Sequence, residues 1–322
     1  MPRAALIAAL AALALAIVGC SGGSTGDRPE REATMLLDFQ PNAVHAGIFL
    51  ALERDFDGAE GVGLRVRAPG ATTDAVRLLL SERVDMALLD IHDLALARQE
   101  GRDIIGVMAL VQRPLAAVLA QPSVRRPRDL EGRRVGVSGL PSDEAVLSSI
   151  VRGDDGDPSR VRTVTIGFQA VSALLSGRVA GATAFWNAEG VELRARRPST
   201  NQFRVDDFGA PAYPELVLSV TRRTLNESRN VVRATVAALR RGYGDALADP
   251  ESAVSALVER NDGVDREAAA RGFDAVAPAF TVGVRRFGDL DMGRLRAWAR
   301  WEARFGITRR PPDVARAFEP GF

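Results

Sequence analysis

Short apolar runs alternate with amphipathic stretches along much of the chain. Residues 35–37, 64–68 and 84–89 have the length and composition of buried strands. The first two runs are each followed by apolar residues at helical spacing, and further strand-like runs cover residues 115–120 and 216–220. Strands that alternate with helices are typical of an α/β protein. The pattern therefore predicts sheets that are mostly parallel.

From residue 224 onward the pattern becomes mainly helical. Apolar residues recur at helical spacing over residues 230–247, 250–260, 266–276 and 292–305. We expect these helices to cover the sheet that the first part of the chain forms, and to continue down its side.

One helix-to-strand unit occurs twice. Residues 75–84 (AVRLLLSERV) match residues 170–179 (AVSALLSGRV) at seven of ten positions, and an apolar strand follows each. A single repetition at a long offset does not indicate a solenoid, which needs several units at a short period. The match suggests two similar α/β lobes, with chance coincidence of common residues as the alternative. The strand ends at residues 89–92 and 184–187 would then face one crevice.

Two irregular passages indicate where the chain crosses between the lobes. Residues 122–127 are polar and Arg-rich, and residues 209–214 contain Gly and Pro. We therefore assign residues 34–121 and 210–322 to a discontinuous lobe one, and residues 122–209 to lobe two. Each lobe is expected to be a doubly wound, mostly parallel sheet with flanking helices. A chain of 322 residues fits two lobes of ordinary size.

A polar elbow follows the first predicted strand. Pro41 and Asn42 break the strand before the next helix begins. Gln40, Asn42 and His45 are thus expected at the carboxyl end of a strand and the start of a helix, where open α/β sheets bind ligands. The alternative is that Asn42 only caps the helix and that His45 is a surface residue.

A second candidate region is FWNAEGVEL, residues 185–193. Trp186 and Asn187 end a predicted strand, and Glu189 lies in the first turn of the next helix. A planar heterocycle with an amino group could stack on the indole and donate to the carboxylate or amide. Alternatively, Trp186 belongs to the core and Glu189 complements the helix dipole.

Four more residues complete the expected ligand site. Asp90 ends a strand, and Thr72 lies in the turn before a helix. Ser138 occupies a strand-to-helix turn whose backbone N–H groups could hold a polar group or an anion, unless the turn only lets Ser142 cap the helix. Tyr213 lies at the return crossing, where it could cover a ligand or pack between the lobes.

Composition adds limits to this picture. Net charge is +1, from 42 basic and 41 acidic residues, so no electrostatic attraction to nucleic acid is expected. Apolar residues make up 46% and charged residues 26%, as in ordinary soluble proteins. Every basic residue is Arg.

The first twenty residues have the features of a secretion signal. Arg3 precedes an unbroken apolar run over residues 4–18, and a small-residue site ends in Cys20, the single cysteine. This site resembles the lipobox of bacterial lipoproteins, which implies cleavage before residue 20 and acylation of its thiol. A plain signal peptide or a membrane-spanning anchor is the alternative, although the apolar run is short for spanning a bilayer. Residues 1–20 are thus a predicted lipoprotein signal peptide, and residues 21–33 a flexible tether.

The elbow and FWNAEGVEL together resemble a known family, the bacterial solute-binding proteins for thiamine pyrimidine precursors and the related fungal hydroxymethylpyrimidine synthases. The matching positions in the first region are Phe39, Pro41, Asn42, His45, Gly47, Phe56, Glu60 and Gly61. The resemblance implies a periplasmic-binding-protein type 2 fold in a monomer that is lipid-anchored at the outer face of the cytoplasmic membrane. It also implies a ligand of the formylaminopyrimidine or hydroxymethylpyrimidine type, and an ABC permease as the partner. Riboflavin, an alkanesulfonate or nitrate is the alternative ligand.

Catalytic groups are scarce in the sequence. One cysteine and two histidines, His45 and His92, give no His/Cys metal cluster, and residues 136–140 miss the G-x-S-x-G pattern by one position. The fungal synthases of the resembling family depend on a lysine-bound pyridoxal phosphate and a cysteine cluster, whereas this chain has no lysine. We therefore expect no enzyme activity, cofactor or metal. An enzyme of pyrimidine metabolism would have to use Asp90, His45 and Glu189 as acid and base.

Overall fold

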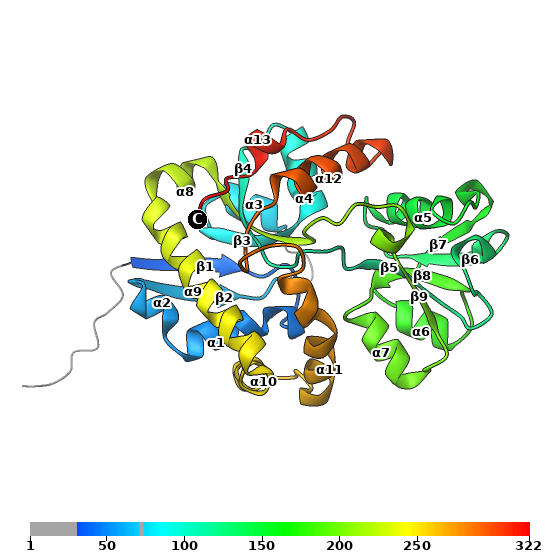
Figure 1. Cartoon of the computed structure of the whole chain (residues 1–322), viewed down its shortest axis with the longest axis horizontal. Helices are drawn as coiled ribbons and strands as arrows, with labels where there is room; N and C mark the ends of the chain where they lie inside the picture. The colour runs from blue at the N-terminus through cyan, green and yellow to red at the C-terminus, as the bar shows by residue number, and fades with distance from the viewer. Residues whose placement is uncertain (1–30, 71–73) are drawn as a thin grey trace, which may run out of the picture.

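The structure is a computed structural model that describes residues 31–70 and 74–322. Two lobes lie side by side, and two connecting segments join them (Figure 1). Each lobe is built on a five-stranded mixed sheet with flanking helices. The predicted two-lobed α/β fold is therefore confirmed. Among the described helices, none combines the length and apolar character needed to cross a membrane.

Lobe one contains the sheet with strand order β2-β1-β3-β10-β4. Its strands are β1 (Arg31–Leu36), β2 (Val62–Arg67), β3 (Met86–Asp90), β4 (Ile104–Ala109) and β10 (Leu216–Thr221). Strand β10 is antiparallel to β3 and β4, whereas β1 pairs in parallel with β2 and β3. Because β1 begins at residue 31, the last three residues of the predicted tether 21–33 belong to the sheet.

Lobe two contains the sheet with strand order β7-β6-β8-β5-β9. Its strands are β5 (Ala116–Ala120), β6 (Arg134–Val137), β7 (Arg162–Thr165), β8 (Gly181–Phe185) and β9 (Asn201–Arg204). Strand β5 pairs antiparallel with β8 and β9, so the chain has already crossed before residue 116. This corrects the predicted boundary after residue 121. The polar passage after β5 is a surface turn that leads into the short helix η2 (Pro127–Leu130) of the same lobe.

The internal sequence match corresponds to a structural repeat. Helix α3 (Ala75–Leu80) precedes β3, and helix α6 (Ala170–Leu175) precedes β8; both strands are third in their sheets. Each helix is followed by a left-handed residue, Glu82 with φ 57° and Gly177 with φ 73°. Strand ends at equivalent positions of the two lobes therefore meet at one cleft.

Helices cover the faces of both sheets. In lobe one they are α1 (Ala46–Glu53), α2 (Phe56–Ala59), α4 (Ile91–Gln99), α8 (Arg222–Glu227), α9 (Arg229–Ala248), α10 (Pro250–Glu259), α11 (Arg266–Val276), α12 (Met292–Arg304) and α13 (Val314–Ala317). In lobe two, α5 (Asp143–Arg152) and α7 (Glu189–Arg196) accompany α6. The bounds of α9 to α12 agree with the four helices predicted from spacing to within one residue.

Helix α9 fixes the elbow that precedes α1. The two helices pack closely because Gly47 lies against the ring of Tyr243, and a methyl group there would overlap the ring. The buried Tyr243 hydroxyl donates a hydrogen bond to the carbonyl oxygen of Val44 (2.7 Å). The elbow thus rests on a rigid surface of lobe one.

Candidate functional site

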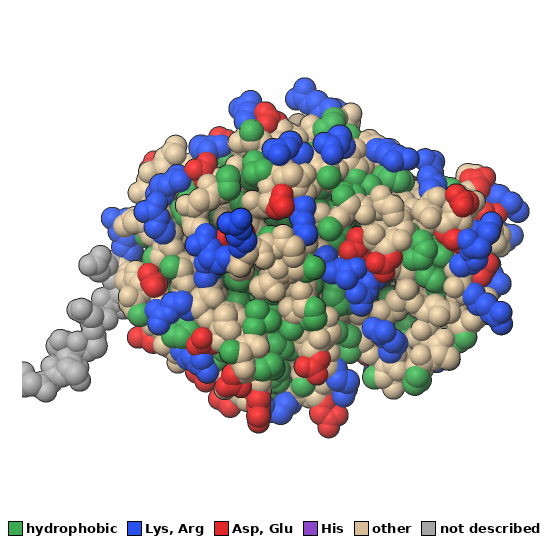
Figure 2. Space-filling model, in the orientation of Figure 1, with side chains coloured by type: hydrophobic (Ala, Val, Ile, Leu, Met, Phe, Trp, Pro, Cys, Tyr) green, Lys and Arg blue, Asp and Glu red, His purple; other side chains and the backbone are tan. Residues whose placement is uncertain are grey.

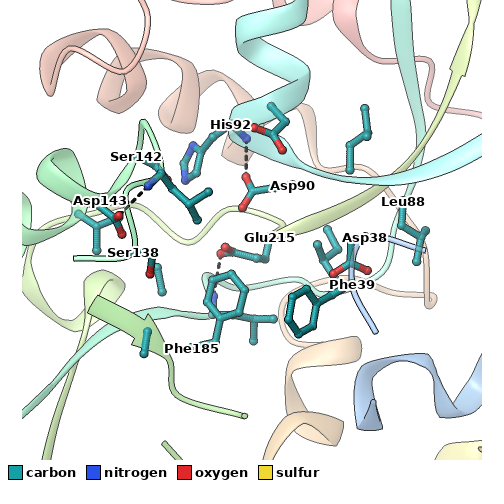
Figure 3. Close-up of a pocket in the computed structure, with 18 of the residues that line it drawn as sticks. Asp38, Phe39, Leu88, Asp90, His92, Ser138, Ser142, Asp143, Phe185 and Glu215 are labelled. Atoms are coloured by element: carbon teal, nitrogen blue, oxygen red, sulfur yellow. Dashed lines mark hydrogen bonds between the residues drawn. The ribbon is translucent and has the colours of Figure 1, made fainter. Parts of the chain in front are cut away.

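A cleft of about 630 Å³ lies between the lobes and is lined by residues of both. Strand β3 contributes Asp90, strand β8 contributes Phe185, and the turn after β6 contributes Ser138. The elbow adds Phe39, and the returning segment adds Glu215. Figure 3 shows these side chains around a common space. The cleft therefore occupies the strand-end position at which open α/β sheets bind ligands.

The polar atoms of the elbow mostly bind one another. The Asn42 side chain accepts from the Val44 N–H (2.9 Å) and donates to the Gln40 carbonyl oxygen (2.9 Å). His45 is fully buried: its Nδ1 accepts from the Asn42 N–H (3.2 Å), so Nε2 carries the proton and donates to Asp38 Oδ1 (2.8 Å). His45 therefore orients the cleft carboxylate of Asp38 and does not itself line the cleft.

Aromatic rings from both lobes reach the cleft. Phe39 of lobe one and Phe168 of lobe two have ring centroids 6.0 Å apart and are 48% and 67% exposed, respectively. Phe185, at the end of β8, lines the same space. These three phenylalanines provide apolar faces for a planar ligand.

Trp186 does not take the predicted stacking position, because it is only 1% exposed and lies outside the cleft lining. Its indole N–H donates to the carbonyl oxygen of Pro114 (2.8 Å), and the Arg204 guanidinium lies 4.0 Å from the ring centroid. Successive residues at a strand end point to opposite sides, and here the preceding Phe185 faces the cleft. Trp186 instead packs where the connecting segments leave lobe two.

The connecting segments are bonded to each other beside the cleft. They comprise residues 110–115 and 205–215. Glu215 is central, because its N–H donates to the Val111 carbonyl oxygen (3.0 Å) and its Oε2 accepts from the Leu115 N–H (2.7 Å). An ion pair between Arg113 and Asp206 (2.9 Å) adds a further link. The floor of the cleft is thus part of the connection between the lobes.

The lining of the cleft is acidic. Among the described residues, it contains eight carboxyl groups, one imidazole (His92) and no guanidinium, although the chain has 42 Arg. The carboxyl groups belong to Asp38, Asp74, Asp90, Asp93, Glu100, Asp143, Glu189 and Glu215. Basic side chains are instead spread over the outer surface (Figure 2).

Several of these carboxyl groups have perturbed protonation. Burial raises the pKa of Glu215 to about 8, with a further contribution from the nearby Asp90 charge. Burial and Asp90 likewise raise the pKa of Asp93 to about 7. Burial also raises the pKa values of Asp90 and Glu189. Near neutral pH, Glu215 is therefore largely protonated, because burial disfavours its charged form.

His92 is paired behind the cleft. Burial alone would lower its pKa, but the carboxylates of Glu302 and Asp90 outweigh that effect and raise it to about 10. Its Nδ1 lies 2.8 Å from Glu302 Oε2, and its Nε2 lies 3.3 Å from the Tyr213 hydroxyl. Tyr213 is completely buried and lies outside the lining. It therefore supports His92 from behind.

Asn187 holds a buried acceptor that has no partner in the described residues. It lines the cleft and is 5% exposed, yet its Oδ1 has no hydrogen-bond partner among the described residues. Buried polar atoms are usually paired, so an unpaired carbonyl oxygen in a cleft marks a position for a ligand donor.

The structure brings only some of the ten predicted site residues together. Those that line the cleft are Asn42, Asp90, Ser138, Asn187 and Glu189. Those that lie outside the lining are Gln40, which donates to the Pro69 carbonyl oxygen (2.7 Å), and His45, Trp186 and Tyr213. Thr72 lies outside the described residues, as does Cys20.

Sequence reasoning missed several lining residues. Asp38, Phe39 and His92 lie within three residues of the ends of the predicted strands 35–37 and 84–89, and that position is a usable signal. Asp143, Phe168 and Glu215 carry no motif, and their approach to the cleft depends on tertiary packing. Within residues 31–70 and 74–322, no group of three or more His, Cys, Asp or Glu residues is arranged to hold a metal ion.

Comparison with solved structures defines the class of fold. The alkanesulfonate-binding protein SsuA from Xanthomonas axonopodis pv. citri superposes with a TM-score of 0.69 at 14% identity, covering 90% of this chain and 98% of that one. The aliphatic sulphonate binding protein SsuA from Escherichia coli gives 0.71 at 11% identity, covering 90% and 93%. The two lobes and their cleft thus form a periplasmic binding protein fold. The chain belongs to the NMT1/THI5 like family, whose model matches residues 42–253.

Proteins with similar sequences include both binding proteins and synthases. A formylaminopyrimidine-binding protein from Halalkalibacterium halodurans is 30% identical over 252 residues, which are 77% of this chain and 76% of the relative. The riboflavin-binding protein RibY from Chloroflexus aurantiacus is 26% identical over 69% and 64%. The 4-amino-5-hydroxymethyl-2-methylpyrimidine phosphate synthase THI5 from Saccharomyces cerevisiae is 24% identical over 68% of each chain.

Proposed function

We propose that the protein is the extracytoplasmic solute-binding component of an ABC importer, and that it binds an aminopyrimidine precursor of thiamine in the cleft. The observation that carries this proposal is the pairing of aromatic rings from both lobes, Phe39 and Phe168, above a floor of hydrogen-bond acceptors. A flat heterocycle can contact such rings while its amino group donates to acceptors at its edge.

The acceptors available for the ring edge come from both lobes. Asn187 and Glu189 lie at the end of β8 and the start of α7, and Asp90 and Glu215 lie on the opposite side. A ligand held by both sets stabilises the closed arrangement of the lobes, because it gains contacts only when the lobes approach each other. Similarity to the formylaminopyrimidine-binding protein from Halalkalibacterium halodurans supports this ligand class.

The proposed role is binding without turnover. The relatives named as synthases match at 24% identity, and this chain has no lysine to bind a pyridoxal phosphate aldehyde. We further propose that the mature protein is a monomer. Its lipid-modified Cys20 anchors it to the outer face of the cytoplasmic membrane, where it delivers its ligand to a permease.

Titration calorimetry tests the ligand. We expect one formylaminopyrimidine bound per chain, weaker binding of riboflavin, and unchanged pyrimidine by chromatography after prolonged incubation. Glu189→Gln should weaken binding by about 1–3 kcal/mol, the usual cost of disturbing a buried hydrogen bond. Glu192→Gln, in the same helix but paired with Arg196 at the surface, is the matched control. Product formation, or parental affinity in the Glu189 variant, would contradict the proposal.

A further inference from the structure

The backbone N–H groups at the strand ends of the cleft are bonded to carboxylates of the protein itself. After β6, Asp143 Oδ2 accepts from the N–H groups of Gly139 (2.7 Å) and Leu140 (2.8 Å). After β8, Glu189 Oε2 accepts from the Phe185 N–H (3.1 Å). In this architecture such groups are where a phosphate or sulfonate would bind. In lobe two, those positions are already occupied by carboxyl oxygens of the protein.

The same arrangement recurs on the other side of the cleft. Asp90 Oδ1 accepts from the His92 N–H (2.7 Å), and Glu215 Oε2 accepts from the Leu115 N–H (2.7 Å). Figure 3 shows the Asp143, Asp90 and Glu215 carboxyl groups facing the shared space. An anion entering the cleft would therefore meet carboxylates where it requires N–H donors.

The only basic side chain that lines the cleft, within the part of the chain that the structure describes, is His92. None of the lining residues is Arg, and the chain has no Lys. The imidazole of His92 is engaged by Glu302 and Tyr213, so its charge is balanced within the protein. An anionic ligand would thus find no free cationic side chain among residues 31–70 and 74–322 that line the cleft.

Two acceptor atoms, by contrast, have no partner within the described part of the chain. Asn187 Oδ1 is buried in the lining without a partner, which independently indicates a ligand that donates a hydrogen bond. The Glu215 side chain accepts from Leu115 through Oε2, and its Oε1 has no hydrogen-bond partner among the described residues. A ligand N–H group would supply the donor that Asn187 Oδ1 lacks.

We propose that the cleft selects neutral or cationic ligands that supply N–H donors, and that it excludes the phosphorylated and sulfonated forms of the same compounds. This inference rests on the proposed function, because it assumes that the cleft binds a solute. It separates this chain from a phosphate-ester binder of the same fold.

Binding measurements on the full-length protein test the selectivity. The probes are 4-amino-5-hydroxymethyl-2-methylpyrimidine, its phosphate ester, inorganic phosphate and methanesulfonate, examined by calorimetry and thermal shift at one ionic strength. We expect the ester to bind at least about 100-fold more weakly than the free alcohol, because its charge faces carboxylates in a poorly solvated site. Ester affinity within tenfold of the alcohol, or stabilisation by either simple anion, would overturn the inference.

The two proposals fail in different ways. If no aminopyrimidine binds, the proposed ligand is wrong. The measurements with inorganic phosphate and methanesulfonate would still show whether the cleft excludes anions. Strong binding of the ester together with the alcohol would leave solute binding intact and remove the selectivity.

A gain-of-function variant tests the structural cause. Asp143→Ala frees the N–H groups of Gly139 and Leu140 and should raise the affinity for inorganic phosphate at least about tenfold. Asp157→Ala, which removes a comparable cap at an exposed turn of lobe two, is the control and should not change it. Glu189→Ala, which frees the Phe185 N–H, replaces Asp143→Ala if that variant does not fold. No gain in a folded variant would show that the carboxylates do not occupy anion positions.

Discussion

The carboxylate of Glu215 accepts a hydrogen bond from the backbone N–H of Leu115 (2.7 Å), and this bond joins the two segments that connect the lobes. The same carboxyl group lines the cleft. A ligand donor that reaches Glu215 therefore acts directly on the connection between the lobes, with no intervening residue.

Two substitutions separate these roles of Glu215. Glu215→Gln keeps an oxygen that can accept from Leu115 but replaces the carboxyl group that lines the cleft, so we expect weaker ligand binding with little loss of stability. Glu215→Ala also leaves the Leu115 N–H unpaired and should lower the free energy of unfolding by about 1–3 kcal/mol. Urea denaturation and calorimetry measure the two effects. Parental affinity in both variants would exclude contact between Glu215 and the ligand.

Trp186 should contribute to stability more than to binding. Trp186→Phe removes the bond to Pro114 and should cost about 0.5–1.5 kcal/mol of unfolding free energy, with less than about a threefold change in ligand affinity. Phe168→Ala should show the reverse pattern, because the exposed ring faces the cleft and supports little of the core. Denaturation and titration of both variants decide between these expectations. A large loss of affinity in Trp186→Phe would restore the indole as a ligand contact.

Stability of the ligand-free protein should fall as pH rises from about 5 to 9. The pKa of Glu215 is raised from 4.5 to about 8 and that of Asp93 from 3.8 to about 7, so the folded state holds more protons than the unfolded state within those intervals. His92, raised from 6.5 to about 10, acts in the same direction at higher pH, since its stabilising charge is progressively lost there.

Thermal denaturation across this range measures the effect. Asp90, Asp206 and His92 also act on Glu215, so Glu215→Gln should flatten the dependence between pH 5 and 8 without abolishing it. Glu227→Gln, at an exposed ion pair, is the control. A melting temperature that rises steadily toward pH 9 would contradict the assignment.

Anchoring is tested at Cys20. Cys20→Ser should shift the protein from the membrane fraction to the soluble extracytoplasmic fraction, because stable attachment requires acyl chains. Fractionation with immunodetection measures the shift, and metabolic labelling with a fatty acid gives a second readout. Membrane retention of the unlabelled variant would exclude lipidation as the anchor.

Patterns of local spacing were sufficient to predict much of the fold. Residues 266–276 form α11 at the predicted bounds. The prediction succeeded because the buried face of an amphipathic helix appears in the sequence as apolar residues at helical spacing. Strand β7 was not predicted, since all four of its residues are exposed at the edge of the sheet and no apolar alternation marks it. The predicted position of the first crossing between the lobes was wrong. Strand β5 is apolar throughout, and an apolar composition does not show to which of the two sheets a strand belongs.

The site was harder to predict for a related reason. Of the adjacent aromatics Phe185 and Trp186, the sequence does not show which one turns toward the cleft. His45 lies after a strand end, as predicted. Its ring, however, is hydrogen-bonded to Asp38 and does not line the cleft. The bond between His92 and Glu302 joins residues 210 positions apart, and α12 lies beyond the part of the chain that the family model matches.

Helix α12 also reaches across to the other lobe. Its Trp301 indole N–H donates to Ser149 Oγ in α5 (3.1 Å). Two of the three tryptophans in the chain, Trp186 and Trp301, thus lie where the lobes join, whereas Trp298 is sealed in the core. Rotation of one lobe would change the surroundings of both indoles. The protein therefore carries its own optical reporter, and its intrinsic fluorescence should follow opening and closing in real time without an attached dye.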